Sequence, residues 1–421
     1  MKPGYKQTEI GVIPEDWGVG SLKEAFLRID AGTSVNSDEK AESRYFVLKT
    51  SAVRKGHVNI KEAKPVIASD YPRLKCPIKK GAIIISRMNT PSMVGECGFS
   101  TVDAPNTFLP DRLWQIEALS AEYDFQWLNY LLNTEKYNAA VRATATGTSN
   151  SMKNIAKERL LEIAIPKPLV QEQHHIAEAV SDIDEFIALL EKLIEKKKAI
   201  KQGAMQQLLT GKIRLPGFIE AWKEVKLKKR CIISRGGSPR PIQDYLTDDS
   251  DGIHWIKIGD VDPADKYIVS TREKIKPSGA EKSRSVFKGD LILSNSMSFG
   301  RPYLLKINGC IHDGWLAIQE YQDAFDVDFL YYALCAEYIY QQYVQMAAGS
   351  SVKNLNKEKV GNLVIRYPED KKEQKAIAAI LSDMDDELEV LNKRFSKAQD
   401  IKLGMMQQLL TGQIRLIEKG E

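Results

Sequence analysis

The chain has little of what a metal site or a disulfide framework requires. Its five cysteines (Cys76, Cys97, Cys231, Cys310 and Cys335) are scattered over 421 residues, odd in number and without a C-x-x-C pair. The five histidines also lack the spacing of metal ligands. This usage excludes a disulfide-rich extracellular domain and a zinc finger, and it predicts a reduced protein of the cytoplasm with no metal site.

Long apolar runs and a strong charge of one sign are missing too. No stretch approaches the roughly 20 apolar residues of a membrane span, and the N-terminal MKPGYKQTEIGVIPEDW is not a signal peptide. We therefore expect no membrane contact. The formal net charge of +4 permits a nucleic-acid partner but does not require one.

Three catalytic motifs are absent as well. There is no Pro-Pro dipeptide, so the N-P-P-Y or D-P-P-F loop with which adenine methyltransferases grip a flipped base is not present. No Gly-Lys-Ser/Thr sequence is available to hold ATP phosphates. The one Pro-Asp dipeptide, Pro110–Asp111, has no Asp/Glu-x-Lys within the next 30 residues, which argues against a metal-dependent nuclease core.

What the chain does contain is an internal repeat. MQQLLTGKIRL at Met205–Leu215 returns, with one difference, as MQQLLTGQIRL at Met406–Leu416, 201 positions later. EQHHIAEAVSDID matches EQKAIAAILSDMD at the same offset, and SMKNIAKERLLEIAIPKP matches SVKNLNKEKVGNLVIRYP at an offset of 200. Trp17 corresponds to Trp222. The chain is therefore a duplicated unit of about 200 residues.

The last quarter of each unit has the pattern of a long helix. In the second copy, apolar residues recur at alternating steps of four and three from Ile377 to Leu409, with Lys402 as a polar exception. In the first copy, Lys197 and Lys201 interrupt the same seam. This heptad spacing predicts coiled-coil helices of about 38 residues, each roughly 57 Å long.

The ends of these helices are marked by proline and glycine. Pro168 and Pro368 stand just before the helices, where they cannot interrupt them. Gly211 and Gly412 follow Leu-Leu-Thr, as in a left-handed helix C-cap. Two helices from a duplicated unit most simply pack antiparallel about a pseudo-twofold axis. The N-terminal GVIPEDW resembles RLPGFIEAW, which follows the first cap, so the repeat looks cyclic.

The upstream part of each unit reads as a mixed domain. RYFVLKTS, AIIISR and RLWQIEA are rich in β-branched and aromatic residues and predict strands. Asp124 is a candidate cap of a following helix, and LEIAIP returns as a strand. The second copy repeats this order in GIHWIKIGDV, DLILSNS and NLVIRYP, but the polar loops between the strands diverge completely. Similar scaffolds with dissimilar loops predict two binding modules for different ligands.

Taken together, these segments resemble the specificity (S) subunit of type I restriction–modification systems. The resemblance covers nearly the whole chain and depends on EQHHIAEAVSDID with MQQLLTGKIRL, their second copies, IPEDW with Trp17, and TGTSNSMKNI. It implies an α+β protein in which two pseudo-symmetric mixed α/β target-recognition domains, at 1–168 and 218–370, are joined by two long antiparallel coiled-coil helices. The helical spacer regions would occupy 169–217 and 371–421.

The resemblance also implies partners and a division of labour. Each recognition domain would read one half of a bipartite site in double-stranded DNA, and the helices would set the half-site spacing and dock two modification (M) subunits. Those subunits carry S-adenosylmethionine and methylate adenine. Restriction (R) subunits add ATP- and Mg-dependent translocation and cleavage. This chain itself would hold no cofactor and no catalytic residue.

Candidate DNA-contacting residues are polar residues in the divergent loops and in the TGTSNSMKN and AGSSVKN segments, where both copies place Gly, Ser, Lys and Asn beside a helix start. Each could equally be a solvated surface residue, and Ser151 could be only an N-cap. Trp17 and Trp222 are interpreted as core anchors in preference to stacking platforms. The candidates are Lys49, Arg54, Lys55, Arg87, Asn89, Arg112, Ser151, Lys153, Asn154, Lys257, Asp260, Asn295, Ser296, Arg301, Lys353 and Asn354.

Two alternative functions remain open. A self-contained DNA methyltransferase or nuclease is disfavoured by the missing motifs, and assay of the purified protein with cofactor would decide it. A coiled-coil scaffold without DNA binding would leave the polar loops without a role, and a gel-shift assay with partner subunits would identify it.

Overall fold

The computed structural model describes residues 3–118, 121–147, 152–262, 265–295, 300–347 and 355–417. The chain divides into two compact units. Unit 1 consists of Met1–Glu191 and Arg394–Glu421, and unit 2 consists of Lys192–Lys393. Each unit therefore holds one recognition-domain candidate together with part of each long helix. None of the helices in the described ranges is long and apolar enough to cross a membrane.

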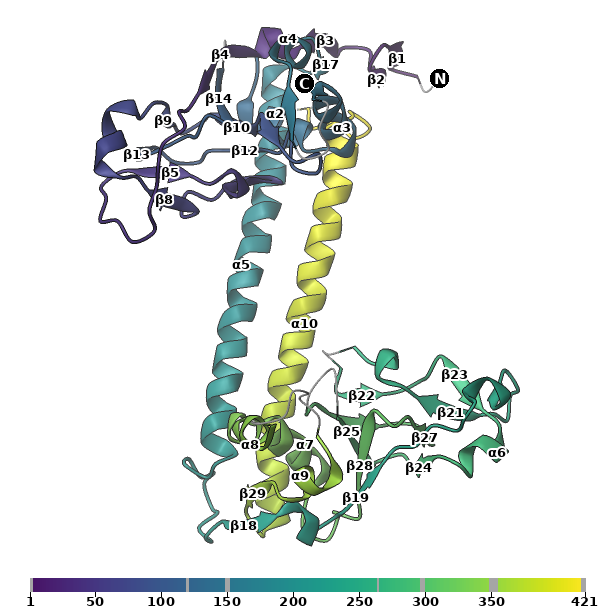
Figure 1. Ribbon diagram of the computed structural model, residues 1–421. Helices are drawn as coiled ribbons and strands as arrows, with labels where there is room; N and C mark the ends of the chain where they lie inside the picture. The colour runs from purple at the N-terminus through teal and green to yellow at the C-terminus, as the bar shows by residue number, and fades with distance from the viewer. Residues whose placement is uncertain are drawn as a thin grey trace. The chain divides into compact units, whose positions relative to one another are not determined.

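Unit 1 is built on a six-stranded sheet in the order β4-β14-β10-β12-β7-β6, beside a four-stranded sheet in the order β8-β5-β13-β9 (Figure 1). Smaller sheets are β1-β2, β17-β3 and β11-β16-β15. The strands are β1 Tyr5–Thr8, β2 Gly11–Pro14, β3 Gly18–Ser21, β4 Phe26–Ala31, β5 Phe46–Leu48, β6 Val53–Arg54, β7 Gly56–Val58, β8 Ala63–Pro65, β9 Pro77–Ile78, β10 Ile83–Ser86, β11 Met88–Asn89, β12 Cys97–Phe99, β13 Ala104–Phe108, β14 Leu113–Ala118, β15 Ala145–Thr146, β16 Lys153–Ile155 and β17 Ala164–Lys167.

The helices of unit 1 cover one face of the larger sheet and complete its core. They are α1 Leu22–Ala25, α2 Phe125–Leu132, α3 Glu135–Ala143 and α4 Lys157–Leu161, with 3-10 turns η1 Thr50–Ala52 and η2 Ala68–Arg73. The predicted cap of α2 is confirmed, because the Asp124 carboxylate accepts from the backbone N–H groups of Gln126 and Trp127, both at 2.9 Å. Ile83, Ile116 and Trp127 are fully buried in the core that results.

Unit 2 repeats this plan with two five-stranded sheets, β19-β28-β25-β26-β22 and β20-β23-β21-β27-β24, and a β18-β29 pair that matches β3-β17. Its strands are β18 Lys223–Lys226, β19 Ile232–Arg235, β20 Leu246–Thr247, β21 Ile253–Ile256, β22 Tyr267–Ile268, β23 Glu273–Ile275, β24 Arg284–Val286, β25 Leu291–Ser294, β26 Pro302–Leu305, β27 Gly309–Ile311, β28 Trp315–Gln319 and β29 Val364–Tyr367. Its helices are η3 Leu227–Lys229, η4 Ile242–Asp244, η5 Ile258–Asp260, α6 Pro277–Ala280, α7 Val327–Cys335, α8 Glu337–Ala347 and α9 Lys357–Gly361.

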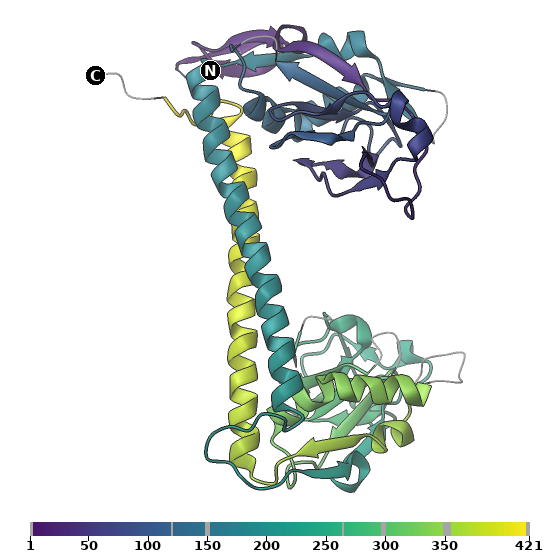
Figure 2. The same cartoon turned by 90° about the vertical axis from the view of Figure 1, so that its left-hand side faces the viewer.

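The two predicted long helices are α5 (Val170–Leu208) and α10 (Lys371–Leu409), each of 39 residues. In unit 1 the start of α5 packs on the end of α10, with Ile176 and Val180 in the same cluster as Leu409 (Figures 1 and 2). In unit 2 the end of α5 packs on the start of α10, with Leu208 beside Ile377. The two helices are therefore antiparallel within each unit, and the expected α+β class with two mixed domains and a coiled coil is confirmed.

Glycine allows the same close approach of two backbones in both units. A Cβ atom built at Gly32 would lie 1.7 Å from the carbonyl oxygen of Leu109, and one at Gly236 would lie 2.1 Å from that of His312. Any side chain at either position would force the chain away from the loop that precedes β14 or β28. These glycines therefore fix the position of the loops that carry the candidate site residues.

Candidate nucleic-acid interface

The next-to-last residue of each MQQLLTG-x-IRL segment is an arginine that binds a buried glutamate in its unit. In unit 1 the Arg415 guanidinium donates to both oxygens of Glu172, at 2.7 and 2.8 Å, and Trp17 Nε1 donates to the same carboxylate at 2.9 Å. Arg415 also binds both oxygens of Asp16, and this bonding lowers the pKa of the Asp16 carboxyl. The C-terminal segment therefore packs against the N-terminal segment, which confirms the cyclic character of the repeat.

Unit 2 contains the same arrangement. Arg214 donates to both oxygens of Glu373 at 2.7 and 2.8 Å, and Trp222 Nε1 donates to it at 3.3 Å. The side chains of Glu172 and Glu373 are only 1% and 2% exposed, so each carboxylate is buried and paired with an arginine. Trp17 is fully buried, so the interpretation of the tryptophans as core anchors is confirmed there, and Trp222 packs against the core of unit 2.

The lysines that interrupt the predicted seam are paired in the structure. Lys402 lies 2.5 Å from Asp184, whose other oxygen accepts from Tyr130 at 3.1 Å. In unit 2, Lys201 pairs with Asp385, which also accepts from Tyr332 at 2.7 Å. Burial, reinforced by Asp184, raises the pKa of Tyr130 to about 12. Each domain is thus tied to the end of the other copy's long helix.

Five candidate residues of unit 1 come together around the small sheet β11-β16-β15. Asn89 pairs with Lys153 and Met88 with Asn154 across β11 and β16. The Ile155 N–H donates to Arg87 O at 2.8 Å, and the Arg87 N–H donates to Arg112 O at 3.0 Å. Arg87 and Arg112, which are separated in the chain by β11, β12 and β13, are therefore neighbours of the Lys153–Asn154 strand.

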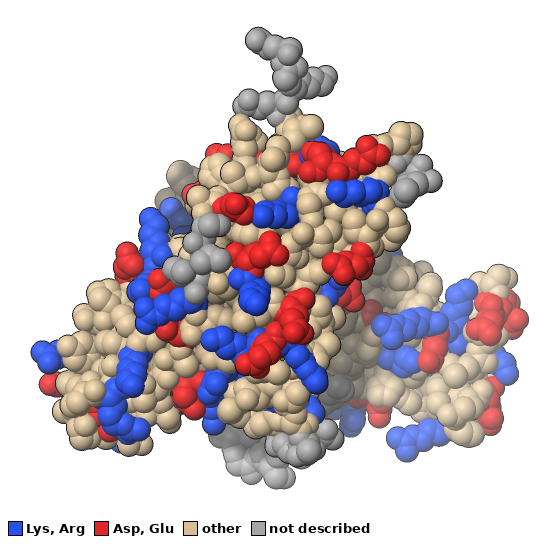
Figure 3. Space-filling model, turned by 90° about the horizontal axis from the view of Figure 1, so that it is seen from above, with Lys and Arg blue, Asp and Glu red and all other residues tan. Residues whose placement is uncertain are grey.

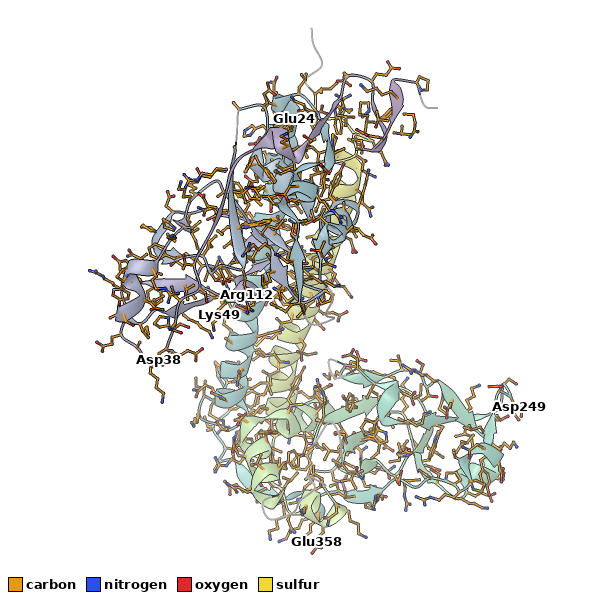
Figure 4. The ribbon with its side chains drawn as sticks, turned by 45° about the horizontal axis from the view of Figure 1, so that its top comes forward. Glu24, Asp38, Lys49, Arg112, Asp249 and Glu358 are labelled. Carbon is orange, nitrogen blue, oxygen red and sulfur yellow. The ribbon has the colours of Figure 1, made fainter. Side chains whose placement is uncertain are left out.

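The other candidates of unit 1 lie on adjoining loops. Lys49 follows β5, which runs parallel to β13, so the end of β5 lies beside the loop that follows β13 and carries Arg112. Figure 4 shows Lys49 and Arg112 near each other, with Glu24 at the far end of the unit. Arg54 is the last residue of β6 and pairs with His57 of β7, and Lys55 lies in the turn between the two strands. The Lys55 N–H donates to the Glu96 carboxylate at 3.0 Å, and Lys55 has a positive φ of 49°.

Unit 2 has the same backbone frame with different side chains. The Leu355 N–H donates to Asn295 O at 3.0 Å, and the Asn295 N–H donates to Gly314 O at 3.0 Å. Asn295 therefore takes the place of Arg87, and Gly314 takes the place of Arg112. Arg87 Nε donates to Asp111 O at 2.6 Å, and Asn295 Nδ2 donates to Asp313 O at 2.8 Å, so even this side-chain bond recurs. Asn295 is only 3% exposed.

The remaining candidates of unit 2 are distributed differently. Lys257 lies 2.5 Å from Glu273, and Asp260 accepts from the Lys257 N–H at 2.8 Å, which gives Asp260 a helix-capping role. The Arg301 guanidinium lies 5.9 Å from the centre of the Tyr303 ring. Ser151, Ser296, Lys353 and Asn354 lie outside the described residues.

Sequence reasoning missed a polar cluster beside Asn295. The Ser238 hydroxyl donates to Asp313 at 3.0 Å, and His312 Nε2 lies 2.8 Å from the same carboxylate. Ser238 follows β19, while His312 and Asp313 precede β28, so no local motif joins them. The signal that could have found them is the pair of glycines at positions 236 and 314, which flank the cluster.

Charge on the surface is mixed. On the face of unit 1 seen in Figure 3, Lys and Arg side chains are interspersed with Asp and Glu, and no single sign dominates. Several basic side chains are already paired with acids, such as Lys79 with Glu117 at 2.6 Å and Arg142 with Glu96 at 2.8 Å. This pattern agrees with the net charge of +4, and it gives a polyanion little long-range attraction.

Comparison with known proteins supplies the family. A model described as the type I restriction modification DNA specificity domain matches the chain twice, at residues 14–199 and 219–397. The chain belongs to this family. The resemblance found in the sequence is therefore confirmed, and the two matches correspond to the two copies of the repeat.

Individual relatives agree. The chain is 25% identical over 430 residues to the putative type I restriction enzyme MjaX specificity subunit of Methanocaldococcus jannaschii, a match that covers 98% of this chain and 97% of the relative. It is 33% identical over 218 residues to the MjaVIII specificity subunit of the same organism, covering 50% and 49% of the two chains. The fold is shared with a solved S subunit from M. genitalium at a TM-score of 0.58 and 19% identity, covering 97% of this chain and 99% of that one.

Proposed function

We propose that this chain is the non-catalytic DNA-recognition subunit of a type I restriction–modification complex, and that unit 1 and unit 2 each read one half of a bipartite site. The observation that carries the proposal is the common backbone frame around Arg87 and Asn295, which presents arginines in one unit and an amide and a glycine in the other. A frame of fixed geometry with different side chains suits two readers of different base sequences.

The residues divide by role in this proposal. In unit 1, Asn89, Arg112, Lys153 and Asn154 contact DNA directly, with Lys49, Arg54 and Lys55 on the adjoining loops reaching phosphates. Arg87 and Asn295 position the loops through the carbonyls of Asp111 and Asp313. In unit 2, Lys257 and Arg301 are contacts and Asp260 is a capping residue. Four residues complete the proposed set: Ser151, Lys353 and Asn354, which precede α4 and α9 in the sequence, and Ser296, which follows β25.

The partners follow from the same proposal. Two modification subunits dock on the helical regions and bring S-adenosylmethionine, and restriction subunits bring ATP- and Mg-dependent cleavage. Recognition domains at 1–168 and 218–370 are separated by helical regions at 169–217 and 371–421, which set the half-site spacing. Because +4 is little charge for binding phosphates, the chain alone binds DNA weakly, and its partners make the complex tight.

Methylation mapping tests the proposal. Host DNA is sequenced for modified adenine with and without this chain, in cells that carry the modification subunit of the same system. We expect a two-part methylated sequence with a fixed gap that disappears when this chain is deleted. A modified sequence that persists without the chain would refute the recognition role, and methylation by the purified chain with S-adenosylmethionine alone would show a self-contained enzyme.

A further inference from the structure

One end of each unit is built on the same backbone but carries a different charge. In unit 2 the Leu227 N–H donates to Leu363 O at 2.9 Å, and in unit 1 the Leu22 N–H donates to Ile163 O at 3.1 Å. Both donors belong to fully buried leucines that begin α1 and η3. The strands before them, β3 and β18, pair with β17 and β29 in the same antiparallel register. The two ends can therefore be compared residue by residue.

We call this part of each unit its far end. It consists of residues 18–25 and 157–162 in unit 1, and of residues 223–230 and 357–362 in unit 2. The far end of unit 1 has three cationic and three acidic residues, a net charge of zero. The far end of unit 2 has seven cationic and two acidic residues, a net charge of +5, while the whole chain carries +4. The positive charge of the chain is therefore concentrated at one end of unit 2.

Most of these cations have no acidic partner. Every exposed residue in the far end of unit 2 is charged. Lys223 pairs with Glu369 at 2.5 Å, and Arg366 of β29 pairs with Glu224 at 2.7 Å. In the described part of the chain, none of the other six cations forms an ion pair with a carboxylate, and these six are Lys226, Lys228, Lys229, Arg230, Lys357 and Lys359. The fold itself does not use their charge.

A glycine joins the two segments of the far end of unit 2. Gly361 stands where unit 1 has Leu161, and a Cβ atom at Gly361 would lie only 3.1 Å from the Cβ atom of Lys228. Without a side chain at this position, the stem of Lys228 packs directly on α9. The cations of η3 and α9 therefore form one surface.

The composition of this surface suits phosphates better than it suits another protein. The centres of protein–protein interfaces are rich in apolar and aromatic residues and poor in lysine. Here every exposed side chain is charged, and five of the six unpaired cations are lysines. Lysine and arginine bind the phosphates of nucleic acids without reading their sequence.

The surface is also continuous with the shared backbone frame of unit 2. Leu355, whose N–H donates to Asn295 O at 3.0 Å, lies two residues before Lys357. Two residues span at most about 7 Å, and the five residues of α9 add about 8 Å. All of α9 therefore lies within about 15 Å of Asn295, the length of roughly four to five base pairs at about 3.4 Å each.

We infer that the far end of unit 2 binds the phosphates of duplex DNA just outside the half-site that unit 2 reads, and that the far end of unit 1 does not. The inference depends on the proposed function, because unit 2 must first hold its half-site. Such contacts add affinity without sequence preference and release counterions from the DNA. DNA that continues beyond one half-site therefore binds more tightly than DNA that stops there, whereas its length beyond the other half-site has no effect.

Duplexes of different length test this asymmetry. The complex of this chain with its modification subunit is titrated with duplexes that carry the methylated target and end roughly two or roughly twelve base pairs beyond each half-site. A long extension on one side should raise the affinity at least about tenfold at about 0.1 M salt and make it more sensitive to salt. A long extension on the other side should change neither quantity.

Residues taken from unit 1 should remove the effect. The triple variant Lys226→Ser, Lys229→Glu, Arg230→Ala gives unit 2 the residues that unit 1 has at the same positions. Because the three side chains are exposed and form no ion pair, the variant should unfold at the temperature of the wild type. It should bind the short duplex with wild-type affinity and lose the gain from the long extension.

A control variant removes the same charge from a different end of unit 2. Three lysines donate to the loop at 244–250, and these are Lys274, Lys276 and Lys282. Figure 4 shows Asp249 of this loop and Glu358 of α9 at different ends of the unit. The triple variant Lys274→Ser, Lys276→Ala, Lys282→Glu should keep the full gain from the long extension.

The outcomes separate the inference from the proposed function. Equal affinity for all the duplexes, an equal gain on both sides, or a gain that survives in the first triple variant would overturn the inference and leave the recognition role intact. A wild-type complex that binds none of the duplexes would refute the proposed function itself. If longer DNA gave the wild type no gain, and the first triple variant lost the restriction subunit, the occupant would be a protein and the inference would be wrong.

Discussion

Unit 1 presents Arg87 and Arg112 where unit 2 presents Asn295 and Gly314, although the same backbone hydrogen bonds hold both pairs. The helix ends show the opposite relation, because MQQLLTG and the following arginine keep the same residues and the same two bonds to a buried glutamate in both units. Divergence is thus concentrated in the loops that we propose to read DNA, and identity is concentrated where each unit closes on a buried glutamate. The following changes separate these two parts.

Lengthening both helices should have the largest effect. Seven residues that continue the heptad are inserted after Asp184 and after Asp385, which keeps the ion pairs with Lys402 and Lys201 on their own sides of the insertions. Each helix grows by about 10 Å at roughly 1.5 Å per residue. With about 3.4 Å per base pair, the gap between half-sites should widen by one to about three base pairs, with weaker binding because the second half-site also rotates by roughly 100°.

Sequencing methylated DNA from cells with the lengthened chain reads the gap directly. Unchanged half-sites at an unchanged gap would show that the helices do not set the distance.

Removing either buried carboxylate should lower the free energy of unfolding of the unit that contains it. Glu172→Ala leaves Arg415 and Trp17 without their common partner, and loss of one member of a buried ion pair costs about 3–5 kcal/mol. Glu373→Ala should cost somewhat less, because the Trp222 bond is longer and no residue of unit 2 corresponds to Asp16. Calorimetry of both variants gives the loss. As a control, Glu122→Ala removes a surface pair with Lys167 and should cost less than about 1 kcal/mol.

Two substitutions on the shared frame should act in different ways. Arg112→Ala removes an exposed side chain, so it should leave stability unchanged and reduce affinity for one half-site by about 1–3 kcal/mol. Asn295→Ala removes the buried bond to Asp313 O and should instead lower the stability of unit 2 by about 1 kcal/mol. Competition with duplexes mismatched in one half-site, together with thermal unfolding, distinguishes the two. Equal loss of both half-sites in Arg112→Ala would contradict the assignment.

The smallest effect concerns acid. Arg415 holds the pKa of Asp16 below its usual value, so the ionised carboxylate stabilises the fold at neutral pH and this stabilisation is lost as the pH falls through the folded-state pKa, below about 4. Asp16 is 52% exposed, so solvent screening limits the contribution to less than about 1 kcal/mol. Asp16→Asn should remove this part of the acid sensitivity. In unit 2 the position that corresponds to Asp16 is occupied by Ala221, so unit 2 has no such contribution. If the melting temperatures of the wild type and of Asp16→Asn changed equally with pH, the stabilisation by Asp16 would be contradicted.

The sequence predicted the helices well because their signals are local and periodic. These signals are the heptad pattern that starts at Ile377, the glycine caps and the Asp124 cap, and each depends on residues within a few turns of one another. The internal repeat shows each of these patterns a second time. The sequence alone could not explain Lys201 and Lys402, which interrupt the apolar heptad pattern of the two long helices. Their partners Asp385 and Asp184 lie on the opposite helix, so only the packed structure pairs them.

The candidate site was predicted only in outline. Choosing polar loop residues brought in Asn89, Arg112 and Lys153, which do lie together, but it also brought in Asp260 and Asn295, whose side chains bond to the backbone. Composition cannot distinguish a base-reading amide from one that fixes a turn, because both are polar and both lie in loops. Burial distinguishes them, and burial depends on contacts far apart in the chain.

Exchange of one recognition domain tests the central claim most directly. Residues 18–168 are replaced by the corresponding domain of another family member with a known target, and the methylated sequence is read in cells with the modification subunit. We predict that one half of the target changes to that of the donor, while the other half and the gap stay as they were. A swap that alters both halves together, or neither, would contradict the account.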